Sequence, residues 1–378
     1  MKGVKILHCA DLHFDSPFRD SDSSYREKRK EDLRETFGAI IDKAVKEEVN
    51  IILMAGDLFD NATVMKTTVD YVIRKLKEIP DIRVFISPGN HDPYHGKSFY
   101  KIIPWPNNVH VFQDKLEKVH IESLNTVVYG IGFGDSYERQ GLIECMESEI
   151  DIEDNKINIM VMHGDVTSSC SEYNPITLEH IGKSKMDYIA LGHKHDFSGI
   201  LRESDTFYAY SGNPEGRGFD ECGDKGIILG TVYKKYVELS FEPIAKRKYV
   251  ICSIDISGCR DYEEVKTMIL KESDNVSREK NLFKIILCGE VPEDFIINKE
   301  LLKEKIKDDF FYVKLEDNTT ISIDYEEIAG EFSLRGLYAK KILKSIEEET
   351  EPLEKELLYK ALKLGIESLT AKEVKMKW

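Results

Sequence analysis

The sequence predicts an α/β protein with two sheets flanked by helices, a small α+β domain after them and a helical tail. Apolar runs alternate with amphipathic segments over residues 4–92, a pattern typical of parallel strands joined by right-handed helical crossovers. The run at 51–55 is apolar throughout, as expected for a strand covered on both faces, and it stops at Gly56-Asp57. From residue 109 the apolar runs are shorter and more β-like, which predicts a second sheet.

Three strands and two helices are expected in the first part of the chain. Apolar residues recur at helical spacing between Tyr25 and Glu48, which predicts an amphipathic helix. A second amphipathic helix carries apolar residues from 69 to 76 and ends before Pro80. The strands that these helices connect are 4–9, 51–55 and 82–86.

The second sheet is expected from β runs between residues 109 and 242. One further helix is expected near 137–148, ahead of a strand that delivers His163. The expected strands are 126–131, 157–162, 188–191, 207–210, 226–232 and 236–241.

Residues Glu242-Pro243-Ile244, with the basic run that follows them, mark an expected domain boundary. The predicted domains are 1–243, 244–330 and 331–378. The middle domain alternates strands and helices in the order of a split βαβ unit. Its expected elements are strands 249–256, 282–288 and 311–315 and helices 262–272 and 299–307. The tail has helical periodicity and is interrupted at Glu351-Pro352.

The composition excludes several classes of protein. No apolar run reaches the length of a membrane helix and the start of the chain lacks a signal-peptide pattern, so a cytoplasmic protein without a membrane segment is expected. The net charge of −16 argues against a protein that coats nucleic acid by itself. The seven cysteines never form a Cys-x-x-Cys pair, which favours free thiols over a zinc knuckle.

Potential metal ligands follow apolar runs five times along the chain. They are Asp11 with His13, Asp57, Asn90 with His91, His163, and His193 with His195. Each motif alone is a weak signal, but five at strand ends favour a metal site over coincidence. Imidazole and carboxylate ligands suit manganese, iron or zinc. A shared carboxylate would hold two ions ~3.5–4 Å apart, and Asp57 at the sheet centre is the natural bridge.

The order of these motifs resembles that of the calcineurin-like metallophosphoesterases. The resemblance covers residues 4–242 and includes Gly89-Asn90-His91-Asp92 and Gly192-His193-Lys194-His195. It implies two divalent cations, with manganese favoured and iron or zinc as alternatives. The implied ligands are Asp11, His13, Asp57 and His195 for the first ion and Asp57, Asn90, His163 and His193 for the second. It also implies that His91 is catalytic and is not a ligand.

Within that family the chain is similar to bacterial DNA repair exonucleases of the SbcD and YhaO type, relatives of the nuclease subunit of the double-strand-break repair complex. The motifs Asp15-Ser16-Pro17 and Gly56–Asp60 carry this likeness. Some relatives have a histidine where this chain has Asp60, so any catalytic role of that histidine is absent here. The loop that ends at Arg217 resembles the family's substrate-side loop, so Arg217 is expected to bind phosphate or, alternatively, to pair with a nearby acid.

The resemblance therefore implies a metal-dependent DNA exonuclease, with single-strand endonuclease activity as an additional expectation. The middle domain would cap the active site and help to place DNA, and the tail would dock on an SMC-like coiled-coil ATPase. One alternative is a metallophosphoesterase for a small phosphodiester or phosphoprotein, which the charge of −16 favours. Another is a catalytically silent scaffold, but the complete set of expected ligands argues against it. Metal identity, cleavage polarity and a homodimer stay open.

Overall fold

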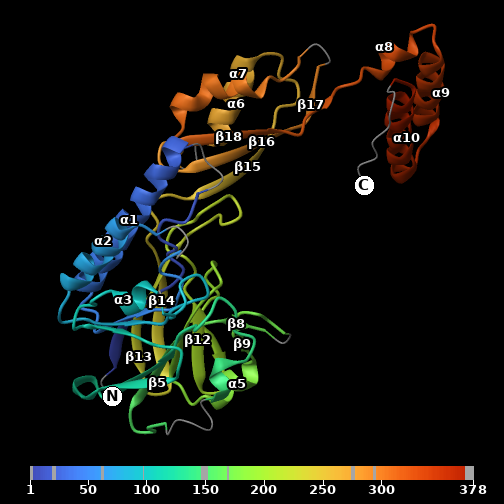
Figure 1. The fold of residues 1–378 in the computed structure, drawn as a ribbon. Helices are drawn as coiled ribbons and strands as arrows, with labels where there is room; N and C mark the ends of the chain where they lie inside the picture. Colours follow the sequence, from blue (N-terminus) through green and yellow to red (C-terminus); the bar gives the residue numbers. More distant parts are fainter. Residues whose placement is uncertain are drawn as a thin grey trace. The chain divides into compact units, whose positions relative to one another are not determined.

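The computed structural model describes residues 3–18, 23–60, 64–96, 98–145, 152–167, 170–273, 277–292 and 295–370. Within these ranges the chain forms two compact units (Figure 1). Unit 1 comprises 1–252, 273–285 and 306–314, and unit 2 comprises 253–272, 286–305 and 315–378. The described helices include none that is both long and apolar enough to cross a membrane.

Unit 1 contains two six-stranded sheets, each with parallel strands at its centre. In the first sheet, of order β14-β13-β1-β2-β3-β4, strands β1 to β4 run parallel, and β13 and β14 add an antiparallel edge. Its strands are β1 (Val4–Cys9), β2 (Ile51–Met54), β3 (Arg83–Ile86), β4 (Val109–Val111), β13 (Gly226–Tyr233) and β14 (Tyr236–Pro243).

The second sheet has the order β11-β12-β10-β7-β6-β5 and a parallel centre of β6, β7, β10 and β12. Its strands are β5 (Glu117–Ile121), β6 (Thr126–Ile131), β7 (Ile157–His163), β10 (Tyr188–Gly192), β11 (Leu201–Glu203) and β12 (Thr206–Tyr210). A short pair, β8 (Asp165–Val166) and β9 (Pro175–Ile176), lies beside it in Figure 1.

The two sheets pack face to face, because alternate residues of each strand point to opposite faces. Ile6, Ile51 and Leu53 of the first sheet share one buried core with Ile159 and Ala190 of the second. The other face of the first sheet is covered by α1 (Ser23–Lys46) and α2 (Lys66–Lys77), whose apolar residues form a second core (Figure 1). The outer face of the second sheet packs on η2 (Leu142–Cys145) and α5 (Leu178–Lys183). The layers are therefore helix, sheet, sheet, helix.

The chain beyond residue 248 supplies a three-stranded sheet and several helices. Strands β15 (Tyr249–Asp255), β16 (Leu282–Cys288) and β18 (Tyr312–Asp317) lie in the order β15-β16-β18, and the division between the units falls within them. Unit 2 also holds α6 (Tyr262–Glu272), β17 (Glu290–Val291), β19 (Thr320–Ile321) and all but the last residue of α7 (Lys299–Ile306).

The tail forms a helical module with a small core of its own. Helices α8 (Tyr325–Ala329), α9 (Leu334–Glu348) and α10 (Pro352–Thr370) enclose buried Ala339, Ile346, Leu362 and Ile366. The predicted interruption at Glu351-Pro352 is confirmed, because α10 begins at Pro352. The predicted domain limits at 243 and 330 stay predictions.

The predicted fold class is confirmed, and two details of the element assignment were wrong. The segment 137–141 is not helical: Glu138 donates its backbone N–H to Glu172 and accepts from Asn174, and these bonds between loops replace the intrahelical ones. The remainder of the expected helix is the short η2 up to Cys145, and residues 146–148 lie outside the described ranges. The short helices α3 (Phe99–Ile102) and α5 were not predicted.

Candidate metal centre

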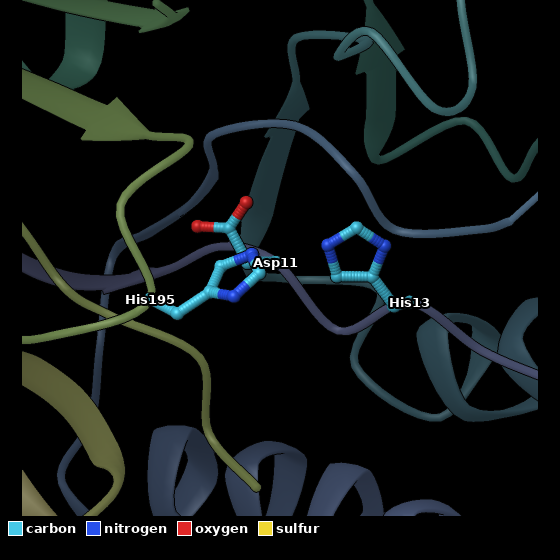
Figure 2. A group of neighbouring side chains, drawn as sticks. All are labelled: Asp11, His13 and His195. Carbon is cyan, nitrogen blue, oxygen red and sulfur yellow. The ribbon is translucent and has the colours of Figure 1, made fainter. Parts of the chain in front are cut away.

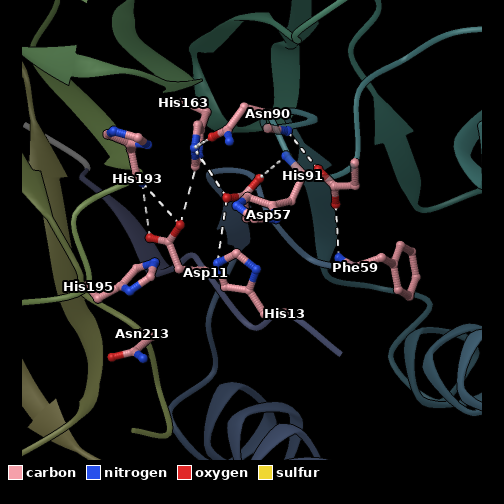
Figure 3. A network of polar contacts seen from close by, with 12 residues as sticks. Asp11, His13, Asp57, Phe59, Asn90, His91, His163, His193, His195 and Asn213 are labelled. Carbon is pink, nitrogen blue, oxygen red and sulfur yellow. Dashed lines mark hydrogen bonds and ion pairs between the residues drawn. The ribbon is translucent and has the colours of Figure 1, made fainter. Parts of the chain in front are cut away.

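The carboxyl ends of five strands bring the expected ligands to one place (Figure 3). Strands β1, β2 and β3 are neighbours in the first sheet, and β7 and β10 are neighbours in the second. The loops after β1 and β2 turn sharply, because Asp11, His13 and Asp57 have φ angles of 54°, 47° and 52°. His193, after β10, has a φ of 109°. Side chains other than glycine rarely adopt such angles, and strained residues of this kind cluster at functional sites.

Asp57 is central to the cluster. Its Oδ2 lies 3.5 Å from the Nε2 atoms of both His13 and His163, which come from different sheets. Its other oxygen, Oδ1, accepts a hydrogen bond from the backbone N–H of His91 at 2.9 Å. Asp57 thus leaves one carboxylate oxygen free between two imidazoles, which is the position that a bridging ligand requires.

His163 is held in the tautomer that can bind a metal through Nε2. Its Nδ1 lies 3.0 Å from the carbonyl oxygen of Ala55, and a carbonyl only accepts, so Nδ1 carries the proton. The lone pair of Nε2 then faces Asn90 Oδ1 at 2.9 Å and Asp57. The Nε2 lone pair and these oxygen atoms are all acceptors, so they do not hydrogen-bond to one another. A cation bound between them would satisfy all of them.

His13 gives the most direct test of whether these residues fit a metal. The residue is 1% exposed, and neither ring nitrogen has a hydrogen-bond partner among the described residues. A buried polar atom without a partner is costly unless an ion or water satisfies it. His13 also belongs, with Asp11 and His195, to a group whose potential ligand atoms lie within 4.8 Å of one another (Figure 2).

Two more groups of this kind overlap the first. One contains Asp11, Asp57 and His163, and the other contains His13, Asp57 and His91. Asp11, His13 and Asp57 each occur in two of the three groups, and this overlap fits a centre with more than one ion. The group of His13, Asp57 and His91 places His91 within reach of a cation, so the prediction that His91 is catalytic and not a ligand stays a prediction.

Burial sets the protonation states of this cluster. It lowers the pKa of His163 to about 3 and that of His193 to about 4, so both imidazoles are neutral near pH 7, the state that metal binding would require. Burial and the nearby charge of Asp57 raise the pKa of Asp11 well above its ordinary value. Two buried carboxylates are unfavourable side by side, and divalent cations would remove that cost.

His193 and Asp11 are linked through the backbone. The N–H of His193 donates to both carboxylate oxygens of Asp11, at 3.1 and 3.0 Å. The His193 ring packs edge-on against the His163 ring, with centroids 5.2 Å apart. His193 therefore lies on the second-sheet side of the centre, next to the expected ligands of the second ion.

Arg217 lies beside His195, and its guanidinium pairs with the carboxylate of Glu221 at 3.3 Å. Its Nη2 is also 3.2 Å from His195 Nδ1. The alternative of an arginine paired with a nearby acid thus describes its contacts in the structure. Binding of phosphate by Arg217 stays a prediction.

The sequence motifs did not single out the side chains that hold the loop of Asn90. Asp92 is fully buried and accepts from the backbone N–H groups of Gly89 and Phe59, at 2.8 and 2.9 Å, and from the hydroxyl of Tyr100 at 2.5 Å. It thereby ties the loop after β3 to the loop after β2. Burial, with the charge of Asp57 as a second cause, raises the pKa of Asp92 to about 7. Asp92 belongs to the Gly-Asn-His-Asp motif, which was the available signal.

A pair of tyrosines borders the centre. The Tyr173 ring lies 5.0 Å from the His193 ring and stacks on Tyr137 at 5.9 Å and 30°. Both tyrosines line a pocket of about 350 Å³ together with Asn90 and His91. Tyr137 is 56% exposed, so an aromatic face is open to solvent beside the candidate site. No sequence motif indicated it.

The chain resembles known phosphoesterases over most of its length. Residues 4–197 match the family described as calcineurin-like phosphoesterase. A protein named as the uncharacterized metallophosphoesterase YhaO, from Bacillus subtilis, is 30% identical over 77% of this chain and 73% of its own length. The DNA double-strand break repair protein Mre11 of Saccharolobus solfataricus is 26% identical, covering 85% and 84%. One of the subunits of the nuclease SbcCD from Staphylococcus epidermidis is 25% identical, covering 76% and 79%.

Proposed function

The chain belongs to the calcineurin-like phosphoesterase family and is therefore a hydrolase of phosphoesters, and on this premise we propose that it is a manganese-dependent phosphodiesterase that cleaves DNA. We further propose that it is an exonuclease in DNA repair, with single-strand endonuclease activity. Members of the family bind two divalent metals, and the Asp/His clusters described above suit such ions. The cytoplasmic location stays a prediction.

The observation that carries the proposal is the position of Asp57 Oδ2, 3.5 Å from Nε2 of His13 and of His163. We assign the first ion to Asp11, His13, Asp57 and His195 and the second to Asp57, Asn90, His163 and His193. Two such cations would activate water and neutralise charge on the scissile phosphate. Imidazoles, carboxylates and one amide suit manganese, and the described cluster contains no thiolate.

The protein's own contribution is to fix these groups and to supply a proton. The backbone N–H of His91 is anchored to Asp57, while the His91 side chain is exposed and reaches the pocket beside the centre. We assign to its imidazole the protonation of the leaving oxygen. Asp92 supports this role by holding the backbone of the same loop.

DNA as the substrate is supported by the tyrosine pair and by the relatives. An exposed aromatic face next to a phosphodiesterase centre suits an unstacked base, because every base has a π-face that can stack on it. The names of two relatives, a double-strand break repair protein and a component of a nuclease, point the same way. The net charge of −16 favours the second candidate, hydrolysis of a small phosphodiester or a phosphoprotein.

A partner could supply the basic track for DNA that this acidic chain lacks. We propose that the tail docks on an SMC-like coiled-coil ATPase. Helices α9 and α10 bury one face against each other, yet Leu337, Leu353 and Leu357 stay 53%, 80% and 61% exposed. Apolar side chains exposed along a helix pair are typical of surfaces that receive another helix.

A digestion panel tests the substrate. Protein freed of metal and then supplied with manganese is offered linear duplex DNA, a single-stranded circle and bis-p-nitrophenyl phosphate. We expect hydrolysis of all three, all of it abolished by EDTA. Hydrolysis of the small diester without cleavage of either DNA would reject the nuclease and support the small-substrate candidate.

A further inference from the structure

His195 is the expected first-metal ligand that lies farthest from Asp57 in the chain, and a single loop holds it from two sides. Lys225, which is 3% exposed, donates from Nζ to the carbonyl oxygen of His195 at 2.8 Å and to Asp196 at 2.6 Å. Glu221 contacts the His195 ring, with Oε1 at 2.8 Å from Nδ1. Both residues belong to the segment between β12 and β13.

The Glu221 carboxylate is itself fixed by the same loop. Its Oε2 accepts from the side-chain amide of Asn213 at 2.5 Å and from the backbone N–H of Arg217 at 2.9 Å. Gly212 allows the loop to approach this closely: its φ is 71°, and a Cβ there would lie 2.8 Å from the carbonyl oxygen of His195. Glu221 is 8% exposed, so its contacts are little diluted by water.

The contacts of His195 Nδ1 decide the tautomer of the ring. Nδ1 lies 2.8 Å from Glu221 Oε1 and 3.2 Å from the Nη2 of Arg217. An ionised carboxylate only accepts and a guanidinium only donates, so one of the two contacts must be unfavourable for any neutral tautomer. The carboxylate contact is shorter, and Arg217 already donates to the same carboxylate at 3.3 Å. Nδ1 therefore carries the proton, and the lone pair of Nε2 is free.

We propose that Glu221 is a positioning residue for the first metal, acting through His195: it fixes the protonated Nδ1 and the ring orientation, so that Nε2 presents its lone pair to the ion. Carboxylates that accept from the second nitrogen of a metal-bound imidazole orient the ring and raise its basicity. The inference rests on the proposed metal centre, in which His195 is a ligand. It adds a residue that none of the metal-ligand motifs contains.

Manganese binding to the metal-free protein tests the role of Glu221 without reference to catalysis. By titration calorimetry, wild type should bind two ions, and Glu221→Gln should weaken one of them about 10- to 100-fold and leave the other unchanged. Asp220→Asn is the matched control, since Asp220 is the exposed acid next in the chain. In a His195→Ala background the Glu221→Gln change should have no further effect on affinity, because the imidazole through which Glu221 acts would be absent.

Several results would overturn the inference. One is wild-type affinity for both ions in Glu221→Gln. Another is a loss of manganese affinity on Glu221→Gln that is as large in the His195→Ala background as in wild type. The third is a metal-free Glu221→Gln protein that fails to fold. A long-range ¹H–¹⁵N spectrum of the histidines in metal-free wild type is an independent check that needs no variant of Glu221. His195, assigned by comparison with His195→Ala, should show its proton on Nδ1, and a proton on Nε2 would reject the proposal.

The same experiment separates this inference from the proposed function. If His195→Ala retains both ions, the metal assignment is wrong and the inference falls with it. If binding depends on Glu221 as expected while wild type fails to cleave DNA, only the substrate assignment is rejected.

Discussion

Two histidines of the candidate site have a second contact that decides which ring nitrogen is free. Ala55 accepts from His163 and Glu221 accepts from His195, each leaving Nε2 without a proton. His13 has no such partner among the described residues, so only a ligand at the site would settle its tautomer. For His163 and His195, the proton position is thus fixed by neighbours outside the ligand set.

His91 gives the first prediction at this scale. His91→Ala should retain both ions and lose about 10²–10⁴-fold in turnover, because a positioned acid that is not a ligand contributes roughly that much. Metal content by mass spectrometry and turnover on bis-p-nitrophenyl phosphate are measured on the same sample. Loss of one ion together with the His91 side chain would place His91 among the ligands.

His8 gives a second prediction, which concerns stability. His8 is fully buried between the Tyr188 hydroxyl and the carbonyl of Leu191, and burial lowers its pKa to about 3. Below its ordinary pKa near 6.5 the unfolded chain binds a proton that the folded chain excludes until about pH 3, so the free energy of unfolding falls as the pH falls through this range. His8→Gln should reduce that slope by up to about 1.4 kcal/mol per pH unit.

Urea unfolding of the metal-free proteins at several pH values between 7 and 4 measures the effect. His120→Gln, which removes a partly exposed histidine, is the control for loss of one imidazole. Curves for wild type and His8→Gln that run parallel over the whole range would contradict the assignment of a neutral, buried His8.

The residues of the site differ in how well a sequence can indicate them. Asp57 and His163 each stand at the end of an apolar run, so the strand pattern itself indicates both residues. Glu221 stands in no motif and reaches His195 only through the folding of the loop after β12. The positive φ angles at Asp11, His13 and Asp57 were also beyond prediction, because residues other than glycine adopt them uncommonly and the residue type does not show where they occur.

At the scale of elements, periodicity was a reliable guide for long segments and a poor one for short ones. The apolar spacing predicted α1 and α6 closely, because burial of one face dictates that spacing. The expected helix at 137–148 was wrong in its first part because contacts with the loop around Glu172 compete successfully with helix formation. Helix α3 has only four residues, too few for a periodic signal.

The tyrosine pair on the loops before η2 and β9 allows a prediction at this scale. Tyr137→Ala should weaken cleavage of single-stranded DNA about 5- to 100-fold, the range expected for the loss of one base stack, and leave bis-p-nitrophenyl phosphate hydrolysis unchanged. Tyr236→Ala is a matched control, because Tyr236 is 54% exposed and stacks on Tyr233 with similar geometry. Equal losses on both substrates would show that Tyr137 serves the centre itself and does not bind a base.

At the scale of the whole molecule, the helical module of the tail has its own core, which suits a separate task. The core of Ala339, Ile346, Leu362 and Ile366 involves no residue of the candidate site. Deletion of 331–378 should therefore abolish co-purification with a coiled-coil ATPase and leave manganese-dependent hydrolysis of a small diester intact. Circular dichroism verifies that the shortened protein folds.

Two outcomes would contradict this division of tasks. Retained binding of the ATPase by the shortened protein would place the docking surface elsewhere. Unfolding or aggregation of the shortened protein would show that the tail helices are needed for the fold, and the docking proposal would lose its basis. Leu353→Glu in the full chain is the milder companion variant, since Leu353 is 80% exposed.

The central claim is that two cations share Asp57, and a stoichiometric titration tests it most directly. Metal-free protein receives manganese in steps, and bound ions and the rate of bis-p-nitrophenyl phosphate hydrolysis are measured at each step. The account predicts a rate that reaches its plateau at two ions per chain in wild type, and an Asp57→Ala protein that neither binds a tight pair nor turns over. A rate that persists in EDTA, a plateau at one ion, or two tightly bound ions in Asp57→Ala would contradict it.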